Sequence, residues 1–183
     1  MLIKNCQIIY LDRIEKGTVW IEDGKIKAID PVCDIEQMDE VYDANGLYLA
    51  PGFIDVHIHG AGGCDTMDGT KEALCMMAKT IAKYGTTAFV PTTMTCRISE
   101  IRQALKAVQE LQRKKSDGAQ VLGAHLEGPF VSGAALGAQN PKYLLKPSMA
   151  NYQSIVEGYE DTMQEKLLIC KEEGGHLLRW PFL

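Results

Sequence analysis

The sequence beyond Pro51 alternates short apolar runs with longer segments of helical periodicity, and this alternation limits the possible folds more than any other feature. Residues 53–58 and 86–90 are rich in β-branched and aromatic residues, as is typical of strands. Between them, apolar residues at i, i+3, i+4 and i+7 predict an amphipathic helix over residues 70–84, with Gly85 as its C′ residue. The apolar face of this helix is formed by Leu74, Met77, Ala78 and Ile81.

The alternation continues for one more helix and one more strand. Ser99 is predicted to be the N-cap of the second helix, and residues 119–126 are expected to form the third strand. The apolar stripe of the second helix consists of Ile101, Leu105, Val108 and Leu111. Residues 166–169 are a weaker candidate for a fourth strand. Right-handed crossovers in this order build a parallel sheet, whose active groups lie at the carboxyl ends of the strands.

The first 50 residues follow a different pattern, in which short strands are separated by Gly, Asp, Asn and Pro. Asp23-Gly24 stands between two such runs, residues 18–22 and 25–27. An Asp-Gly pair supplies the positive φ angles of a two-residue hairpin turn. We therefore predict a β-hairpin here, within a small β-sandwich segment.

Together these patterns predict an α/β protein, an incomplete (β/α)8 TIM-type barrel preceded by that β segment. The predicted division is 1–50 for the β segment, 51–169 for the first half of the barrel and 170–183 for a tail outside the pattern. A complete barrel takes about 250 residues. Of the 183 residues here, subtracting the first 50 leaves 133, which is enough for about half of one.

Composition and charge exclude several classes of function. Hydrophobic residues make up 46% and charged residues 23% of the chain, as in ordinary soluble proteins. The net charge is −5 and no basic run exceeds residues 113–115, so neither nucleic acid nor a membrane is an expected partner. The six cysteines include no Cys-x-x-Cys pair, and the chain does not begin like a signal peptide. We therefore predict free thiols and a cytoplasmic location.

His57 and His59 are the first candidates for chemistry. They lie two residues apart at the carboxyl end of the first predicted strand of the barrel, so both imidazoles face the same way and can bind one metal ion. A bare His-x-His also fits two polar residues at a strand end. The glycine-rich segment 60–63 that follows favours the metal site, because it lets backbone approach a ligand closely.

Glu127 is the next candidate, because it directly follows the third predicted strand. A carboxylate there would be an anionic metal ligand on the same rim as His57 and His59. A glutamate before Gly128-Pro129 also fits an ordinary solvated loop. His125, one pleat earlier on the same side, fits a hydrogen-bonded core residue better than a ligand.

Other chemistries lack specific motifs. Residues 60–63 do not form a phosphate-binding loop of the G-x-x-x-x-G-K-[ST] type, and Ser132 has no G-x-S-x-G sequence around it. The three threonines that follow the second strand are expected to cap the next loop rather than bind a ligand. They are Thr92, Thr93 and Thr95.

Taken together, the motifs resemble those of the amidohydrolase superfamily and, within it, the N-acetylglucosamine-6-phosphate deacetylases. The resemblance extends from residue 1 to about residue 169. The sequence PGFID at 51–55, followed by His-x-His, is shared by many amidohydrolases. The segments HLEGPF at 125–130 and GAQNP at 137–141 narrow the resemblance to the deacetylases.

The resemblance implies that Glu127 binds a divalent metal and that His57 and His59 hold a second ion or part of a shared site. Ala138 and Gln139 match positions that contact the sugar phosphate. The implied reaction converts N-acetylglucosamine 6-phosphate and water to glucosamine 6-phosphate and acetate, in amino-sugar catabolism. Two imidazoles and a carboxylate suit zinc, iron or manganese alike. The resemblance also implies a homodimer for a full-length relative.

The sequence departs from the family pattern in two places. Residues 131–136 lack the proline and basic residues that are usual there. Family members also continue for roughly as many residues again, supplying further metal-binding histidines, a phosphate-binding arginine and the acid-base aspartate. No catalytic residue is therefore assigned. The end from about Cys170, including His176, does not match, as a frameshift or premature stop would produce, so we expect a truncated hydrolase that is inactive alone.

Two alternatives stay open. The chain would act as a non-catalytic metal-binding or interaction fragment if its exposed sheet edges serve association. It would alternatively be another amidohydrolase, such as a dihydroorotase-like enzyme, since these share the His57-x-His59 pattern. Glu127 argues against the latter, because those enzymes generally use a lysine from the following strand as the bridging ligand.

Overall fold

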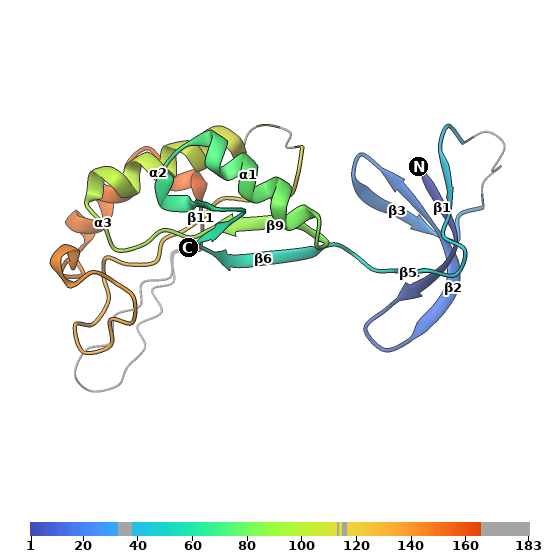
Figure 1. Ribbon diagram of the computed structural model, residues 1–183, viewed down its shortest axis with the longest axis horizontal. Coiled ribbons are helices and arrows are strands. Elements are labelled where there is room, and N and C mark those ends of the chain that lie inside the picture. Colours follow the sequence, from blue (N-terminus) through green and yellow to red (C-terminus); the bar gives the residue numbers. More distant parts are fainter. Residues whose placement is uncertain (33–37, 113, 115–116, 166–183) are drawn as a thin grey trace. The chain divides into compact units, whose positions relative to one another are not determined.

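The protein, seen here as a computed structural model, consists of two compact units, Met1–Pro51 and Gly52–Leu183 (Figure 1). The structure describes residues 1–32, 38–112, 114 and 117–165. The tail predicted over 170–183, with Cys170 and His176, lies outside the described residues, and so do Cys33 and the candidate strand over 166–169. The other four cysteines, Cys6, Cys64, Cys75 and Cys96, are free, as the sequence predicts.

The first unit is built on one five-stranded sheet. Its strands are β1 (Leu2–Ile9), β2 (Ile14–Glu22), β3 (Lys25–Ile29), β4 (Val41–Asp43) and β5 (Tyr48–Leu49). They follow the order β3-β2-β1-β4, with β5 also paired to β1. The pairs β1–β2 and β2–β3 are antiparallel, whereas β4 and β5 run parallel to β1. One sheet is all that the described residues of this unit form, so the predicted sandwich stays a prediction.

The predicted hairpin joins β2 to β3. Asp23 has φ 51° and Gly24 has φ 72°, the two positive angles that this tight turn requires. The pairing of Glu22 with Lys25 places the turn directly between the strands. A small core of buried side chains stabilises the sheet, and it consists of Cys6, Ile8, Val19 and Ala44.

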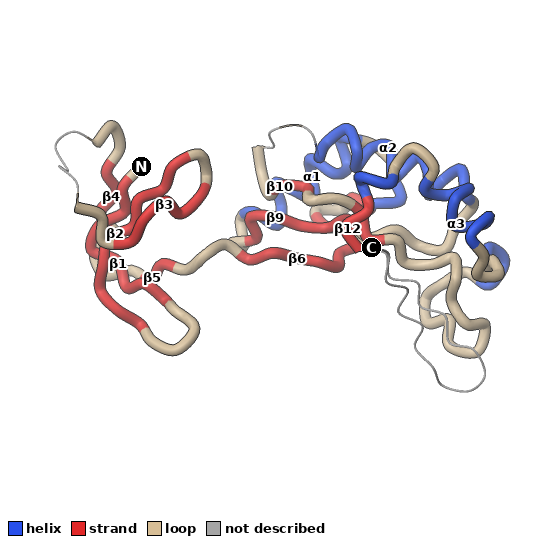
Figure 2. Tube along the Cα trace, turned by 180° about the vertical axis from the view of Figure 1, so that it is seen from behind, coloured by secondary structure: helices blue, strands red, loops and turns tan. Residues whose placement is uncertain are grey.

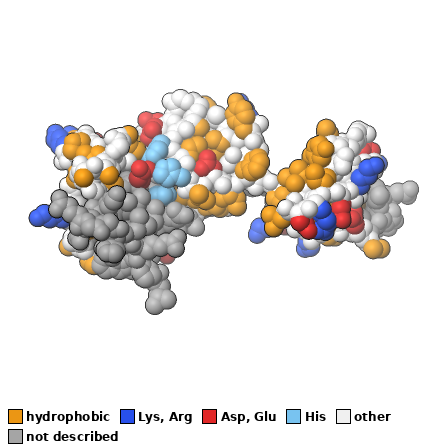
Figure 3. Space-filling model, turned by 90° about the horizontal axis from the view of Figure 1, so that it is seen from below, with side chains coloured by type: hydrophobic (Ala, Val, Ile, Leu, Met, Phe, Trp, Pro, Cys, Tyr) orange, Lys and Arg blue, Asp and Glu red, His pale blue; other side chains and the backbone are white. Residues whose placement is uncertain are grey.

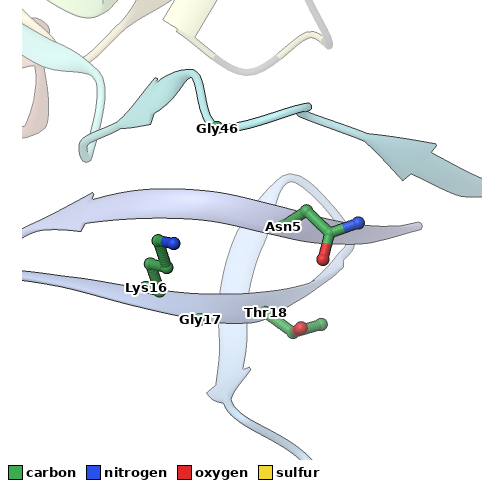
Figure 4. A pocket seen from close by; sticks show the side chains of 5 residues that line it. All are labelled: Asn5, Lys16, Gly17, Thr18 and Gly46. Carbon is green, nitrogen blue, oxygen red and sulfur yellow. The ribbon is translucent and has the colours of Figure 1, made fainter.

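A cavity of about 370 Å³ lies beside this sheet, between β1, β2 and the turn before β5 (Figure 4). Its lining residues are Asn5, Lys16, Gly17, Thr18 and Gly46. The Asn5 amide donates to the Asp43 carboxylate at 3.0 Å, so one wall of the cavity is fixed by a side-chain hydrogen bond.

Asp43 connects β1 to the turn that follows β4. Its carboxylate accepts a hydrogen bond from the Asn45 backbone N–H at 2.9 Å and from the Asn5 amide, and Lys4 Nζ lies 3.6 Å away. These partners favour the ionised form and so lower the pKa of Asp43. The backbone N–H of Asn45 has the largest effect, followed by the Asn5 amide.

The second unit is an α/β layer around a parallel sheet. The main sheet has the order β10-β9-β6, formed by β6 (Phe53–Ile58), β9 (Thr86–Pro91) and β10 (Gln120–Val121). Both pairs are parallel. The short strands β11 (Ala124–His125) and β12 (Met163–Glu165) also pair in parallel, and β7 (Gly60–Ala61) and β8 (Cys64–Asp65) form a small antiparallel pair. The predicted α/β class and parallel sheet are therefore confirmed, and closure into a barrel stays a prediction.

Helices cover one face of this sheet (Figures 1 and 2). They are α1 (Lys71–Ala82) and α2 (Ile98–Gln112), and α3 (Met149–Val156) packs against α2. Short 3-10 turns lie at Thr66–Asp68, Pro141–Tyr143 and Glu160–Thr162. The predicted apolar stripes of α1 and α2 are buried against β9 and β10. Thr70 caps α1, since its side chain accepts the Ala73 N–H at 3.2 Å. Burial of the two stripes holds the layer together.

Several predicted boundaries shift. Helix α2 begins at Ile98, so Ser99 lies inside its first turn and is not the N-cap. The Arg97 N–H, at the start of the helix, instead donates to the Glu100 carboxylate at 3.2 Å. This backbone donor therefore has a partner without a serine cap. Helix α1 ends at Ala82 with Lys83 as C-cap, so Tyr84 is the C′ residue and Gly85, at φ 88°, lies one residue beyond the C′ position predicted for it.

The third predicted strand is interrupted. Val121 pairs with Phe89 and His125 bridges to Thr92, so four steps along one strand face three along the other. This extra residue breaks the ladder and divides residues 119–126 into β10 and β11. A further strand, β12, lies at Met163–Glu165, and α3 was not predicted from the sequence.

No helix within the described ranges combines the length and apolar character that crossing a bilayer requires.

Shortening Leu105 tests the packing of α2 on the sheet. Leu105 is completely buried, so Leu105→Ala is expected to lower the free energy of unfolding by about 2–5 kcal/mol. Urea denaturation followed by circular dichroism measures this change. Lys106→Ala, one residue along on the exposed side of α2, should change it by no more than about 0.5 kcal/mol. Equal effects of the two substitutions would contradict the observed packing.

Replacing Asp43 tests the connection between β1 and the turn after β4. Because the pKa of Asp43 is lower in the folded state, its ionisation stabilises the fold above its ordinary pKa and the contribution disappears as the pH falls through the lowered value. Asp43→Asn should therefore lower the urea midpoint near neutral pH, and this effect should diminish as the pH falls through the lowered pKa of Asp43. Trp20 fluorescence in a Trp180→Phe background reports on this unit. Asp39→Asn, at an exposed carboxylate of the same unit, is the control.

Candidate metal centre

His57 and His59 lie at the carboxyl end of β6. His57 is the penultimate residue of this strand, and His59 stands between β6 and β7 (Gly60–Ala61). Reciprocal hydrogen bonds fix this strand end to the end of β9. The Ile58 N–H donates to Thr92 Oγ1 at 3.0 Å, and the Thr92 N–H donates to the Ile58 carbonyl at 2.8 Å. The backbone around both histidines is therefore held by the neighbouring strand.

Glu127 reaches the same place from β11, two residues beyond His125. Its Oε2 lies 3.1 Å from His57 Nε2 and 3.0 Å from His59 Nε2. One ligand atom of each residue lies within 4.8 Å of the other two. Histidine side chains gather on one face of the Gly52–Leu183 unit, beside acidic side chains (Figure 3). The structure thus brings together the three residues that the sequence singles out as metal ligands.

The environment of His59 decides which of its nitrogens faces Glu127. His59 Nδ1 lies 3.2 Å from the Thr92 carbonyl, which can only accept a hydrogen bond, so Nδ1 carries the proton. In the neutral ring, Nε2 is then a lone pair directed at the carboxylate. A backbone carbonyl that fixes the tautomer in this way is the usual companion of a metal-binding histidine.

The three facing atoms fit a cation. Glu127 Oε2 is buried and has no hydrogen-bond partner among the described residues, although two imidazole nitrogens lie close to it. The anionic Glu127 oxygen and the lone pair on His59 Nε2 repel one another unless a positive charge lies between them. Two imidazoles and one carboxylate are a donor set of divalent transition metals. His57, His59 and Glu127 would hold such an ion.

His125 lies beside this group without joining it. Its side chain is buried, and its ring packs edge-to-face on His57, with centroids 4.8 Å apart and planes at 83°. Its backbone carbonyl accepts the Thr93 N–H at 3.0 Å. His125 packs against a candidate ligand and is outside the group of three whose ligand atoms converge.

The two predicted substrate-contacting residues differ in position. Ala138 is exposed, whereas Gln139 is buried and donates from Nε2 to Glu127 Oε1 at 2.8 Å. The Gln139 carbonyl oxygen accepts the Thr95 backbone N–H at 2.7 Å. The role of both residues toward a substrate stays a prediction.

The threonines after β9 act differently from the loop caps that the sequence suggests. Thr92 joins β6 to β9 and accepts through its carbonyl from His59, while Thr95 holds Gln139 through its backbone. The contacts with His59 and Gln139 use main-chain groups, which a sequence motif does not display. The sequence signal for these contacts is the presence of three threonines in a short segment directly after a strand.

Comparison with known proteins places this arrangement in a family. The sequence profile of the amidohydrolase family matches residues 48–167, which include both histidines and Glu127. The chain belongs to the amidohydrolase family. Members of this family are metal-dependent, which agrees with the donor set at the strand ends.

Relatives within the family carry deacetylase names. The chain is 39% identical over 150 residues to an N-acetylglucosamine-6-phosphate deacetylase of Lysinibacillus sphaericus, with 81% of this chain and 38% of that protein covered. It is 32% identical over 155 residues to an N-acetylgalactosamine-6-phosphate deacetylase of Escherichia coli O157:H7, with 85% and 40% covered. The chain spans about two fifths of the length of these curated relatives.

A solved structure shows the same fold. The crystal structure of N-acetylglucosamine-6-phosphate deacetylase from Pasteurella multocida matches with a TM-score of 0.77 at 27% identity, over 88% of this chain and 42% of that one. The described α/β arrangement is therefore that of an amidohydrolase.

Removing the charge of Glu127 tests the candidate metal centre. Glu127→Gln keeps the shape of the side chain but replaces the anionic oxygen, so Zn²⁺ affinity should fall at least about 100-fold. Competition against a chromophoric chelator at neutral pH measures this affinity. Glu110→Gln, on the exposed side of α2, should leave it unchanged. Native affinity in Glu127→Gln would show that Zn²⁺ binds elsewhere.

Proposed function

We propose that this protein is a metal-dependent amide hydrolase that removes the acetyl group from an N-acetylated amino-sugar 6-phosphate. The observation that carries the proposal is the convergence of His57, His59 and Glu127 at the carboxyl ends of parallel strands. Family membership and the names of the relatives support the reaction and the substrate class. Zinc, iron and manganese all suit this donor set.

Each residue of the site has a distinct part in that reaction. A divalent ion bound there would lower the pKa of a coordinated water and polarise the amide carbonyl. Glu127 supplies the negative charge that balances the ion. His57 and His59 supply neutral nitrogen donors, and the Thr92 carbonyl keeps the proton of His59 on Nδ1. The backbone bonds between Ile58 and Thr92 hold the two strand ends in place.

Protonation of the leaving amine needs an acid that the described residues do not bring to this group. Within the described ranges, Glu127 is the one carboxylate in the set of converging ligands. A general acid contributes roughly 10²–10⁴-fold to a rate. Because the described residues bring no such acid to the site, we propose that the 183-residue chain by itself hydrolyses its substrate slowly.

A second candidate function is a non-catalytic metal-binding or association module. The observation that favours it is β6, at one end of the order β10-β9-β6, which exposes Phe53, Ile54 and Val56. Exposed apolar side chains on an edge strand favour pairing with another chain. Such pairing is also compatible with a homodimeric hydrolase.

Acetate release from the two sugar epimers tests the proposed function. Zinc-loaded native chain, incubated with N-acetylglucosamine 6-phosphate or N-acetylgalactosamine 6-phosphate, should release acetate about 10²–10⁴-fold more slowly than the Lysinibacillus sphaericus deacetylase assayed alongside. Chelation and Glu127→Gln should each abolish the release. Light scattering after size-exclusion chromatography reports the association state of the same sample.

The outcomes separate the two candidates. Metal-dependent acetate release above the Glu127→Gln background supports the hydrolase. Tight metal binding with no release above that background, from either epimer, contradicts it and favours the non-catalytic module.

A further inference from the structure

Gln139 connects a candidate metal ligand to the end of a strand. Its side-chain carbonyl accepts the Thr95 backbone N–H at 2.7 Å, and its Nε2 donates to Glu127 Oε1 at 2.8 Å. The remaining contact of Nε2 is with Met94 Sδ at 3.5 Å. Gln139 is 7% exposed; its bond to Thr95 is buried and its bond to Glu127 is partly buried. Both polar ends of the Gln139 amide are therefore engaged within the protein.

The two partners fix the orientation of this amide. The Thr95 backbone N–H can only donate, so it requires the carbonyl oxygen of Gln139. An ionised carboxylate can only accept, so Glu127 requires the NH₂ group. The opposite orientation would place oxygen against oxygen and N–H against N–H. Gln139 consequently presents a hydrogen-bond donor to Glu127 from a position set by the main chain.

This donor distinguishes the two oxygens of Glu127. Oε1 accepts from Gln139, whereas Oε2 faces the two imidazoles and has no hydrogen-bond partner among the described residues. A carboxylate whose first oxygen is held in this way turns its second oxygen toward a cation. The arrangement favours binding through one oxygen and opposes rotation of the carboxylate.

We propose that Gln139 is a positioning residue for the metal centre, which holds Glu127 Oε1 so that Oε2 alone points between His57 and His59. This inference rests on the proposed metal site. It gives Gln139 a role through Glu127, distinct from the contact with the sugar phosphate that the sequence resemblance implies. Residues that orient a ligand typically change metal affinity roughly 10- to 100-fold when replaced.

The test compares Gln139→Met with the native 183-residue chain. Methionine has nearly the same length but cannot bond to Glu127 or to Thr95. The measurements are the Zn²⁺ dissociation constant from chelator competition, the visible absorption of the Co²⁺-loaded protein and the Tm of the metal-free protein. Gln139→Asn, which keeps the amide but is too short to reach both partners, replaces Gln139→Met if the latter fails to fold.

Gln112→Met is the matched control. Gln112 Nε2 donates to the Leu122 carbonyl at 2.6 Å from a partly buried position, so it also joins a helix to a strand segment. It is not among the residues that converge on the metal centre. Loss of this bond should lower the Tm and leave both the Zn²⁺ affinity and the Co²⁺ spectrum unchanged.

The expected result for Gln139→Met is a Zn²⁺ dissociation constant raised roughly 10- to 100-fold together with an altered Co²⁺ spectrum. A dissociation constant within about twofold of native, with an unchanged spectrum, overturns the positioning role while the metal site stands. Equal losses of affinity in Gln139→Met and Gln112→Met also overturn it, because stability alone would then explain the loss. Absence of Zn²⁺ binding in the native chain overturns the metal site itself, and with it this inference.

Discussion

The parallel hydrogen bonding of β6 to β9 determines where the functional side chains of this protein meet. Strands that run in the same direction end at the same edge, so residues following them become neighbours. The bonds between Ile58 and Thr92 join the two strand ends directly. The bridge from Thr92 to His125 continues this pairing to β11 and brings Glu127 to the same edge. Helices α1 and α2 keep the strands in this order by burying their apolar stripes on one face.

The polar interactions at this edge serve both packing and chemistry. Buried hydrogen-bonding groups need partners, and the amide of Gln139 finds them in the Thr95 backbone and in Glu127. The same bonds leave Glu127 Oε2 facing two nitrogens, which is a costly arrangement without a cation. One set of contacts therefore provides hydrogen-bond partners for the buried loop residues and also prepares a cation site. The fold stabilises the unfavourable arrangement through its apolar core.

Much of the local structure of both units follows from the sequence. The stripes containing Leu74 and Leu105 predict two helices, because a helix that packs on a sheet must bury one face. The pair Asp23-Gly24 predicts a hairpin, because few residues accept two positive φ angles in succession. The predicted start of α2 was wrong by two residues, since the Glu100 carboxylate accepts the Arg97 N–H and a serine cap is not needed. The break between β10 and β11 arises from strand register, which periodicity does not reveal.

The sequence by itself determined the two main helices, the hairpin between β2 and β3, the parallel sheet and the identity of the three candidate metal ligands. These properties depend on residues close together in the chain, where spacing specifies which face each side chain occupies. Only the tertiary structure decided that Glu127 lies about 3 Å from both imidazoles, that His59 carries its proton on Nδ1, and that Gln139 holds the other oxygen. The physical reason is that these contacts join segments that strand register and backbone hydrogen bonds bring together. The local pattern of side chains reveals neither the register nor these bonds.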